Sequence, residues 1–142
     1  MSDCCKGKKG SYVYSCSGAA DTGFISDRVA RMLSVAGHGS MYCLAGLGGG
    51  IESFVKSASE AERNIVIDGC AVKCGKKIMD RHSISCESYV VTDFGFKKGE
   101  TGMSEELVRY AFVKINEAVE TKTPSENVQS SGPGPCSCGG KC

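Results

Sequence analysis

The sequence predicts a small three-layer α/β/α domain of the Rossmann-like kind, with about four mostly parallel strands that alternate with helices. Short runs of β-branched and aromatic residues alternate along the chain with amphipathic helical segments. A chain of 142 residues with 41% hydrophobic residues is also large enough for one domain with a buried core. Strands separated by helices are joined by right-handed crossovers, so we expect a parallel sheet covered on both faces.

Four short segments are expected to form the strands. The first is residues 11–16, with two tyrosines and a valine, and the second, weaker one is residues 41–44. Residues 64–68 contain Ile65, Val66 and Ile67 in a row, which is typical of a strand buried on both faces. Residues 87–94 form the fourth predicted strand.

Helical segments follow each of these strands. Residues 21–36, 51–63, 70–81 and 104–121 carry apolar side chains at helical spacing. Gly37 is expected to end the first helix, and Ser104 is expected to cap the last one, with Glu105 and Glu106 in its first turn. The glycine-rich segment 46–50 is expected to form a turn.

The two ends of the chain differ from the middle in composition. Residues 1–10 contain two cysteines and three lysines, and residues 123–142 contain all three prolines together with many Gly, Ser and Cys residues. Both are predicted to be flexible, which leaves residues 11–122 as the folded domain. The terminal cysteines are Cys4, Cys5, Cys136, Cys138 and Cys142.

Charge and hydropathy exclude several functional classes. The 17 Lys and Arg residues nearly balance the 16 Asp and Glu residues, so we expect no nucleic-acid partner. No apolar run approaches the roughly 18 residues that a membrane span needs, so we expect no membrane partner either. The N-terminal segment has no apolar core of a signal peptide, which predicts a cytoplasmic protein. In a reducing compartment, ten cysteines favour metal binding or redox chemistry over a disulfide framework.

Four cysteines lie where predicted strands end. Cys16 ends the first, Cys43 lies in or at the end of the second, and Cys70 directly follows the third. The carboxyl ends of parallel strands share one edge of the sheet, where ligands bind. Cys74 comes four residues after Cys70, so on a helix the two sulfurs would project from one face. Cys86, just before the fourth strand, is unassigned and could join or replace one of the four.

Four thiolates suit Zn²⁺, which prefers tetrahedral sulfur ligands. The resulting net charge of −2 would be offset by a helix N-terminus near Cys70 and by Lys73, Lys76 and Lys77. A closed shell of four thiolates favours a structural or trafficking role over hydrolysis, which needs an open position for water. The same thiols could instead carry out redox or sulfur transfer, with Cys70 as nucleophile, or hold an iron–sulfur cluster. Whether the protein is an enzyme stays open.

Asp68 lies directly beside this cysteine cluster. It could orient a metal ligand or accept a proton from a thiol, but an Asp at a strand-to-helix junction more commonly caps the helix. The glycine-containing segment 18–23 follows the first strand as a phosphate loop would, yet it lacks the lysine that contacts the phosphates. We therefore do not expect nucleotide binding.

Four motifs occur in order at plausible spacing along the chain. They are Cys16-Ser17-Gly18, Cys43-Leu44-Ala45-Gly46, Asp68-Gly69-Cys70, and Thr92-Asp93-Phe94-Gly95-Phe96-Lys97-Lys98. Together they resemble the DGC-domain family, which is named for its central Asp-Gly-Cys, and the similarity spans about residues 11–115.

That resemblance implies a zinc site formed by four cysteines, which map onto Cys16, Cys43, Cys70 and Cys74. It implies no particular reaction. The chain differs from the family pattern in having extra cysteines at both ends, and the resemblance assigns them no role.

Overall fold

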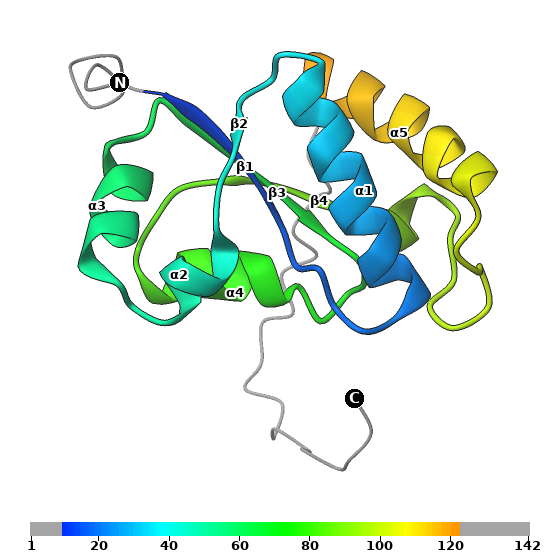
Figure 1. Cartoon of the computed structure of the whole chain (residues 1–142), viewed down its shortest axis with the longest axis horizontal. Helices are drawn as coiled ribbons and strands as arrows, with labels where there is room; N and C mark the ends of the chain where they lie inside the picture. Colours follow the sequence, from blue (N-terminus) through cyan, green and yellow to red (C-terminus); the bar gives the residue numbers. More distant parts are fainter. Residues whose placement is uncertain (1–9, 123–142) are drawn as a thin grey trace, which may run out of the picture.

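The computed structural model describes residues 10–122, in which four parallel strands form one sheet in the order β2-β1-β3-β4 (Figure 1). The strands are β1 (Ser11–Ser15), β2 (Ser40–Met41), β3 (Arg63–Asp68) and β4 (Glu87–Val90). The helices are α1 (Asp21–Val35), α2 (Leu44–Gly48), α3 (Glu52–Glu60), α4 (Cys74–Arg81) and α5 (Glu105–Glu120), with a short 3₁₀ helix, η2 (Val91–Phe94). The predicted flexible ends, residues 1–9 and 123–142, lie outside the described residues.

Helices cover both faces of the sheet, which confirms the predicted three-layer α/β/α architecture. One core cluster packs α1 and α5 against a face that presents Val13, Ile65 and Tyr89. The other packs α2, α3 and α4 against the face that presents Tyr14 and Val66 (Figure 1). Alternate residues of β1 and β3 thus enter opposite cores, as a sheet buried on both faces requires.

The central pair of strands sets the register of the sheet. Val13 of β1 lies beside Ile65 of β3, and Ile67 of β3 lies beside Tyr89 of β4. β2 is the short edge strand, and only two of its residues pair with β1. It is shorter than the predicted segment 41–44, because Cys43 and Leu44 turn away to begin α2.

Several helix boundaries follow local capping as predicted. The Ser104 side chain accepts a hydrogen bond from the Leu107 N–H at 3.3 Å, which confirms Ser104 as the N-cap of α5. Gly37 has a φ of 93°, in the left-handed region that favours glycine just beyond a helix end, and α1 stops before it.

No helix in the described part of the chain combines the length and the apolar character that crossing a membrane requires.

Three further predicted elements differ in the structure. The segment expected to be a glycine-rich turn forms most of α2, because Leu47 is fully buried in the second core cluster. The predicted helix 70–81 begins only at Cys74, since Lys73 has a φ of 54° and lies in the left-handed region. The fourth strand ends at Val90 and continues as η2.

Candidate functional site

The strand order brings three cysteine-bearing strand ends next to one another. β2, β1 and β3 are consecutive in the sheet and all point the same way. Cys43 follows β2 by two residues, Cys16 follows β1 directly, and Cys70 follows β3 by two residues. Cys74 is the first residue of α4, which also begins at this edge. All four are free thiols.

Cys16 connects the end of β1 to both of its neighbours. Its Sγ accepts a hydrogen bond from the Gly69 N–H at 3.3 Å, in the loop that follows β3. The same sulfur lies 3.3 Å from the Ser26 Oγ, and the Ser26 hydroxyl donates its own hydrogen to the Gly23 carbonyl at 2.7 Å. Cys16 therefore contacts both the loop after β3 and the first turns of α1.

Cys43 directly precedes α2 and is its N-cap residue. Its Sγ accepts a hydrogen bond from the Gly46 N–H at 3.3 Å, so the thiol fills the N-cap position where a hydroxyl or carboxylate is more usual. Its side chain is exposed to solvent. The sulfur is thus fixed at the sheet edge yet accessible to a ligand.

Cys70 and Cys74 do not lie on one helix face, contrary to the expectation from their spacing. Cys70 belongs to the loop before α4, where its carbonyl accepts a hydrogen bond from the Lys73 N–H at 3.0 Å. Burial raises the pKa of Cys74, and the nearby Asp68 carboxylate raises it further, although the charge of Lys77 opposes this. Cys70 follows Gly69, whose N–H donates to the Cys16 sulfur, and Cys74 begins α4 after the same loop, so the three thiols lie around the end of β3.

The Asp68 side chain caps the N-terminus of α4. One carboxylate oxygen accepts the Gly75 N–H at 2.7 Å and the other accepts the Lys76 N–H at 3.0 Å. Its side chain is 1% exposed, and burial raises the pKa of Asp68 although the two hydrogen bonds and the charges of Lys73 and Lys77 oppose this. Because both oxygens are engaged by the backbone, the capping role explains this residue.

At Gly69 the loop after β3 passes so close to the backbone at the start of α1 that only glycine fits. A Cβ at this position would lie 2.7 Å from the Thr22 carbonyl carbon and 2.8 Å from the Gly23 nitrogen, at the start of α1. The loop after β3 can therefore pass this helix only with glycine. This contact gives the Asp-Gly-Cys motif a physical reason for its central residue.

The four candidate ligands are near one another without being gathered around one point. Among residues 10–122, no group of three or more His, Cys, Asp or Glu side chains is arranged to hold a metal ion as it stands. The pair that shares a cavity is Cys16 and Cys43, whereas Cys70 and Cys74 lie in and after the next loop. A common metal site would need these side chains to turn toward one another.

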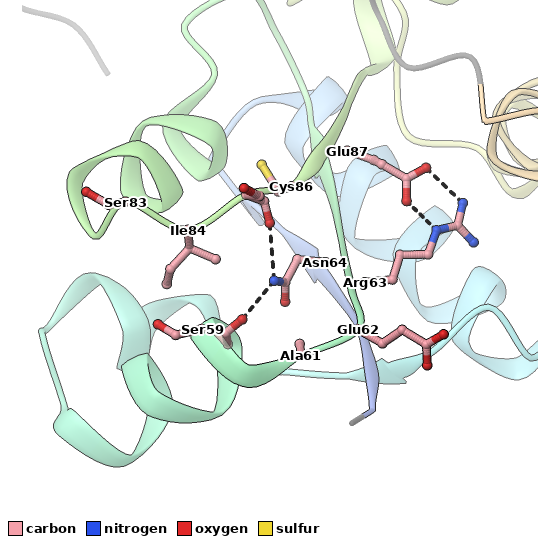
Figure 2. Close-up of a pocket in the computed structure, with 11 residues that line it drawn as sticks. Ser59, Ala61, Glu62, Arg63, Asn64, Ser83, Ile84, Cys86 and Glu87 are labelled. Atoms are coloured by element: carbon pink, nitrogen blue, oxygen red, sulfur yellow. Dashed lines mark hydrogen bonds and ion pairs between the residues drawn. The ribbon is translucent and has the colours of Figure 1, made fainter. Parts of the chain in front are cut away.

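Cys86 lies at the opposite end of the strands from this group. It directly precedes β4, at the amino ends of the strands, and lines a cavity of about 390 Å³ (Figure 2). In that cavity the Asn64 amide donates to the carbonyls of Ala58 and Ser85, and Arg63 forms an ion pair with Glu87 (Figure 2). These polar groups bond to one another and so hold α3, β3 and β4 together. Few of their donors and acceptors remain free to bind a ligand.

Sequence reasoning missed a polar cluster beside Cys16. The Ser17 hydroxyl donates to Asp27 at 3.0 Å, and the Arg31 Nε donates to the other oxygen of the same carboxylate at 2.9 Å. Asp27 and Arg31 have the i, i+4 spacing of a helix ion pair, which is visible in the sequence. Their position next to a cysteine follows only from the packing of α1 on β1.

A parallel α/β sheet with thiols at three adjacent strand ends defines the class of this domain. Residues 12–115 match the DGC domain family, and the chain belongs to that family. It is also 30% identical over 87 residues to the anaerobic and virulence modulator AnvM of Pseudomonas aeruginosa. The aligned region covers 61% of this chain and 66% of AnvM, just under two thirds of that protein. No solved structure matches the chain.

Proposed function

We propose that this protein binds Zn²⁺ through Cys16, Cys43, Cys70 and Cys74 and uses the site for metal handling or regulation in a reducing, cytoplasmic setting. The strand order carries the proposal, because β2, β1 and β3 are consecutive and each is followed within two residues by a cysteine. Ligands of parallel sheets bind at this edge. Four thiolates form the ligand set that tetrahedral zinc prefers.

The surroundings of the thiols suit negatively charged sulfur. Backbone N–H groups already donate to the Sγ atoms of Cys16 and Cys43, and such hydrogen bonds stabilise a thiolate more than a thiol. Lys73 and Lys77 lie close enough to act electrostatically on Asp68, beside Cys74. Their positive charge would offset the net −2 of a zinc ion with four thiolates.

The sulfurs need to approach one another for zinc to bind. Cys43 and Cys74 have exposed side chains, and Cys70 is in the loop between β3 and α4, so all three can turn without disturbing a core cluster. Zinc binding would then be coupled to a rearrangement of the loop that carries Cys70. A site built in this way suits an ion that is loaded and released rather than one buried permanently.

Thiol redox or sulfur transfer by the same cysteines is the second candidate. It is favoured by the position of Cys16, Cys70 and Cys74 around the end of β3, where all of them are free thiols. In this alternative Cys70 is the nucleophile and Cys74 or Cys43 resolves; the raised pKa of Cys74 fits the resolving role better than the attacking one, because the thiolate is the reactive form. An iron–sulfur cluster on the same ligands would be recognised by its colour and its iron and sulfide content.

The test is elemental analysis of the full chain purified under reducing conditions, with Cys70→Ser compared with Cys86→Ser. We expect Cys70→Ser to lose about one zinc per chain, the content of a single four-thiolate site, while Cys86→Ser keeps it. Deleting residues 123–142 should leave this zinc in place. A metal-free, folded chain that forms a reversible Cys70–Cys74 disulfide would instead establish the redox alternative.

A further inference from the structure

A cavity of about 340 Å³ opens at the carboxyl edge of the sheet between β1 and β2. Two of the four candidate zinc ligands, Cys16 and Cys43, lie in its wall. Its size is at the small end of ligand cavities, which suits a metabolite no larger than an amino acid or small peptide. The cavity is therefore a candidate binding site for a small molecule next to two thiols.

One wall of this cavity carries paired opposite charges. The Asp27 carboxylate accepts hydrogen bonds from Ser17 at 3.0 Å and from Ser15 at 3.4 Å, and from the Arg31 Nε at 2.9 Å. The Asp27 side chain is 23% exposed and that of Arg31 is 63% exposed. The contact with Asp27 uses the Nε of Arg31, so it does not occupy the two terminal nitrogens of the guanidinium.

The backbone at Ser17 is held in an uncommon conformation on the same wall. Ser17 has a φ of 46°, in the left-handed region that non-glycine residues rarely adopt. Its hydroxyl lies 2.6 Å from that of Ser15 and donates to Asp27, so the polar cluster holds the strained residue in place. Strain of this kind persists where the surroundings impose it, and it is concentrated at binding sites.

Other residues that line the cavity contribute apolar side chains. They are Met41, Leu44, Ala45 and Ile78. The cavity thus presents two sulfurs, an apolar lining and a paired carboxylate and guanidinium.

The charge pair selects among small ligands. A ligand with a carboxylate alone would bind Arg31 but place its negative charge beside Asp27, and a ligand with an amine alone would meet the reverse conflict. A zwitterionic ligand supplies a partner for each charge. The thiols, or zinc held by them, favour a ligand that also carries soft sulfur.

We propose that this cavity binds a low-molecular-weight amino-acid thiol. Its carboxylate is held by Arg31, its ammonium by Asp27, and its sulfur lies toward Cys16 and Cys43. No bond is formed or broken in this binding step. Recognition of the zwitterionic head requires only Asp27 and Arg31, so this inference goes beyond the proposed zinc site and does not depend on it.

The experiment is calorimetric titration of the full chain, kept reduced with a phosphine, with L-cysteine as the probe. The analogues are L-serine, which lacks sulfur, cysteamine, which lacks the carboxylate, and 3-mercaptopropionate, which lacks the ammonium. We expect L-cysteine to bind at least about tenfold more tightly than cysteamine and 3-mercaptopropionate, since each lost charge-assisted hydrogen bond costs about 1.5–3 kcal/mol. We also expect it to bind more tightly than L-serine, which keeps both charged groups but lacks the sulfur that faces Cys16 and Cys43. Equal affinities for L-cysteine, cysteamine and 3-mercaptopropionate would overturn the proposal.

Arg31→Gln tests the head-group contact directly. We expect about tenfold weaker binding of L-cysteine and loss of its preference over cysteamine. The matched control is Arg28→Gln on the same helix, because Arg28 pairs with Glu105 and does not line this cavity. An Arg31→Gln protein that binds L-cysteine like the Arg28→Gln control would also overturn the proposal.

Zinc content measured on the same samples separates the two proposals. If the chain holds zinc but shows no preference for L-cysteine, the cavity proposal fails and the zinc proposal stands. If the chain holds no zinc yet shows the preference and its loss in Arg31→Gln, the cavity proposal stands alone. Asp27→Asn should remove the preference over 3-mercaptopropionate, since the ammonium then loses its anionic partner.

Discussion

The Asp68 carboxylate accepts a hydrogen bond from the Gly75 N–H at 2.7 Å, which ties the carboxyl end of β3 to the first turn of α4. This contact spans the loop that carries Cys70 and fixes the start of the helix on which Cys74 lies. A Cβ at Gly75 would meet a Val66 methyl at 2.6 Å and the Asp68 oxygen at 2.9 Å, so only glycine permits it. The position of two candidate ligands therefore depends on one capping carboxylate.

Replacing Asp68 with alanine should destabilise the protein and weaken metal binding together. The loss of the cap should lower the free energy of unfolding by about 2 kcal/mol, because two helix N–H groups lose their acceptor. Denaturant unfolding measures this. The matched control is Asp80→Ala on the same helix, whose exposed ion pair with Lys76 should contribute less than about 0.5 kcal/mol. Equal losses in the two variants would contradict the capping role.

Gly69→Ala should destabilise the fold through a backbone clash. The added methyl would lie 2.7 Å from the Thr22 carbonyl carbon, and overpacking of this kind costs about 1–3 kcal/mol. Gly18→Ala is the control, because its nearest neighbour would be the Cys16 sulfur at 4.0 Å. Thermal unfolding of the two variants measures the difference, and an unchanged melting temperature for Gly69→Ala would show that the two backbones can separate.

Asp21 should hold the loop of residues 95–102 in a pH-dependent way. Its carboxylate accepts backbone hydrogen bonds from Thr22, Gly99, Thr101 and Gly102 at 2.7–3.0 Å. Burial acts to raise the pKa of Asp21, but these four bonds together hold it below its usual value of 3.8. The stabilisation is therefore present above about pH 4 and is lost as the pH falls through the lowered pKa.

Hydrogen exchange tests whether the Asp21 carboxylate holds this loop. We expect the protection of the Gly99, Thr101 and Gly102 amides to be constant from pH 7 to about pH 4 and to fall at lower pH. Asp21→Asn should reduce it at pH 7, whereas Asp93→Asn, at an exposed position in η2, should not. Protection that survives in Asp21→Asn would mean that other contacts hold the loop.

Cys86 should react with alkylating reagents far more slowly than Cys43. Burial raises the pKa of Cys86 to about 11, about two units above that of an ordinary thiol. At pH 8 the thiolate fraction of Cys86 is therefore roughly a hundredfold lower than that of an ordinary thiol. Cys43 has an exposed side chain. Iodoacetamide labelling followed by peptide mapping measures both sites in one sample, with zinc chelated. Similar rates would show that Cys86 is more open than the structure indicates.

The sequence allowed the prediction of the layers, the parallel strands and the edge where the cysteines lie, because these follow from periodicity. The start of α4 could not be predicted in this way. Apolar spacing after Cys70 indicated a helix from that residue onward. The first turn of α4 instead forms where Asp68 accepts the Gly75 N–H, seven residues further on, and this contact is not visible in the apolar spacing. Likewise the i, i+4 pair of Asp27 and Arg31 is visible in the sequence, but its position beside Cys16 requires the packing of α1 on β1.

The most direct test of the central claim is X-ray absorption at the zinc edge, on the reduced chain loaded with one equivalent of Zn²⁺. The account predicts a shell of four sulfurs at about 2.3 Å. In each single Ser variant of Cys16, Cys43, Cys70 and Cys74, one sulfur should be replaced by a lighter ligand or the ion should be lost, and Cys86→Ser should leave the shell intact. A shell of nitrogen and oxygen ligands, or four sulfurs that persist in all four variants, would contradict it.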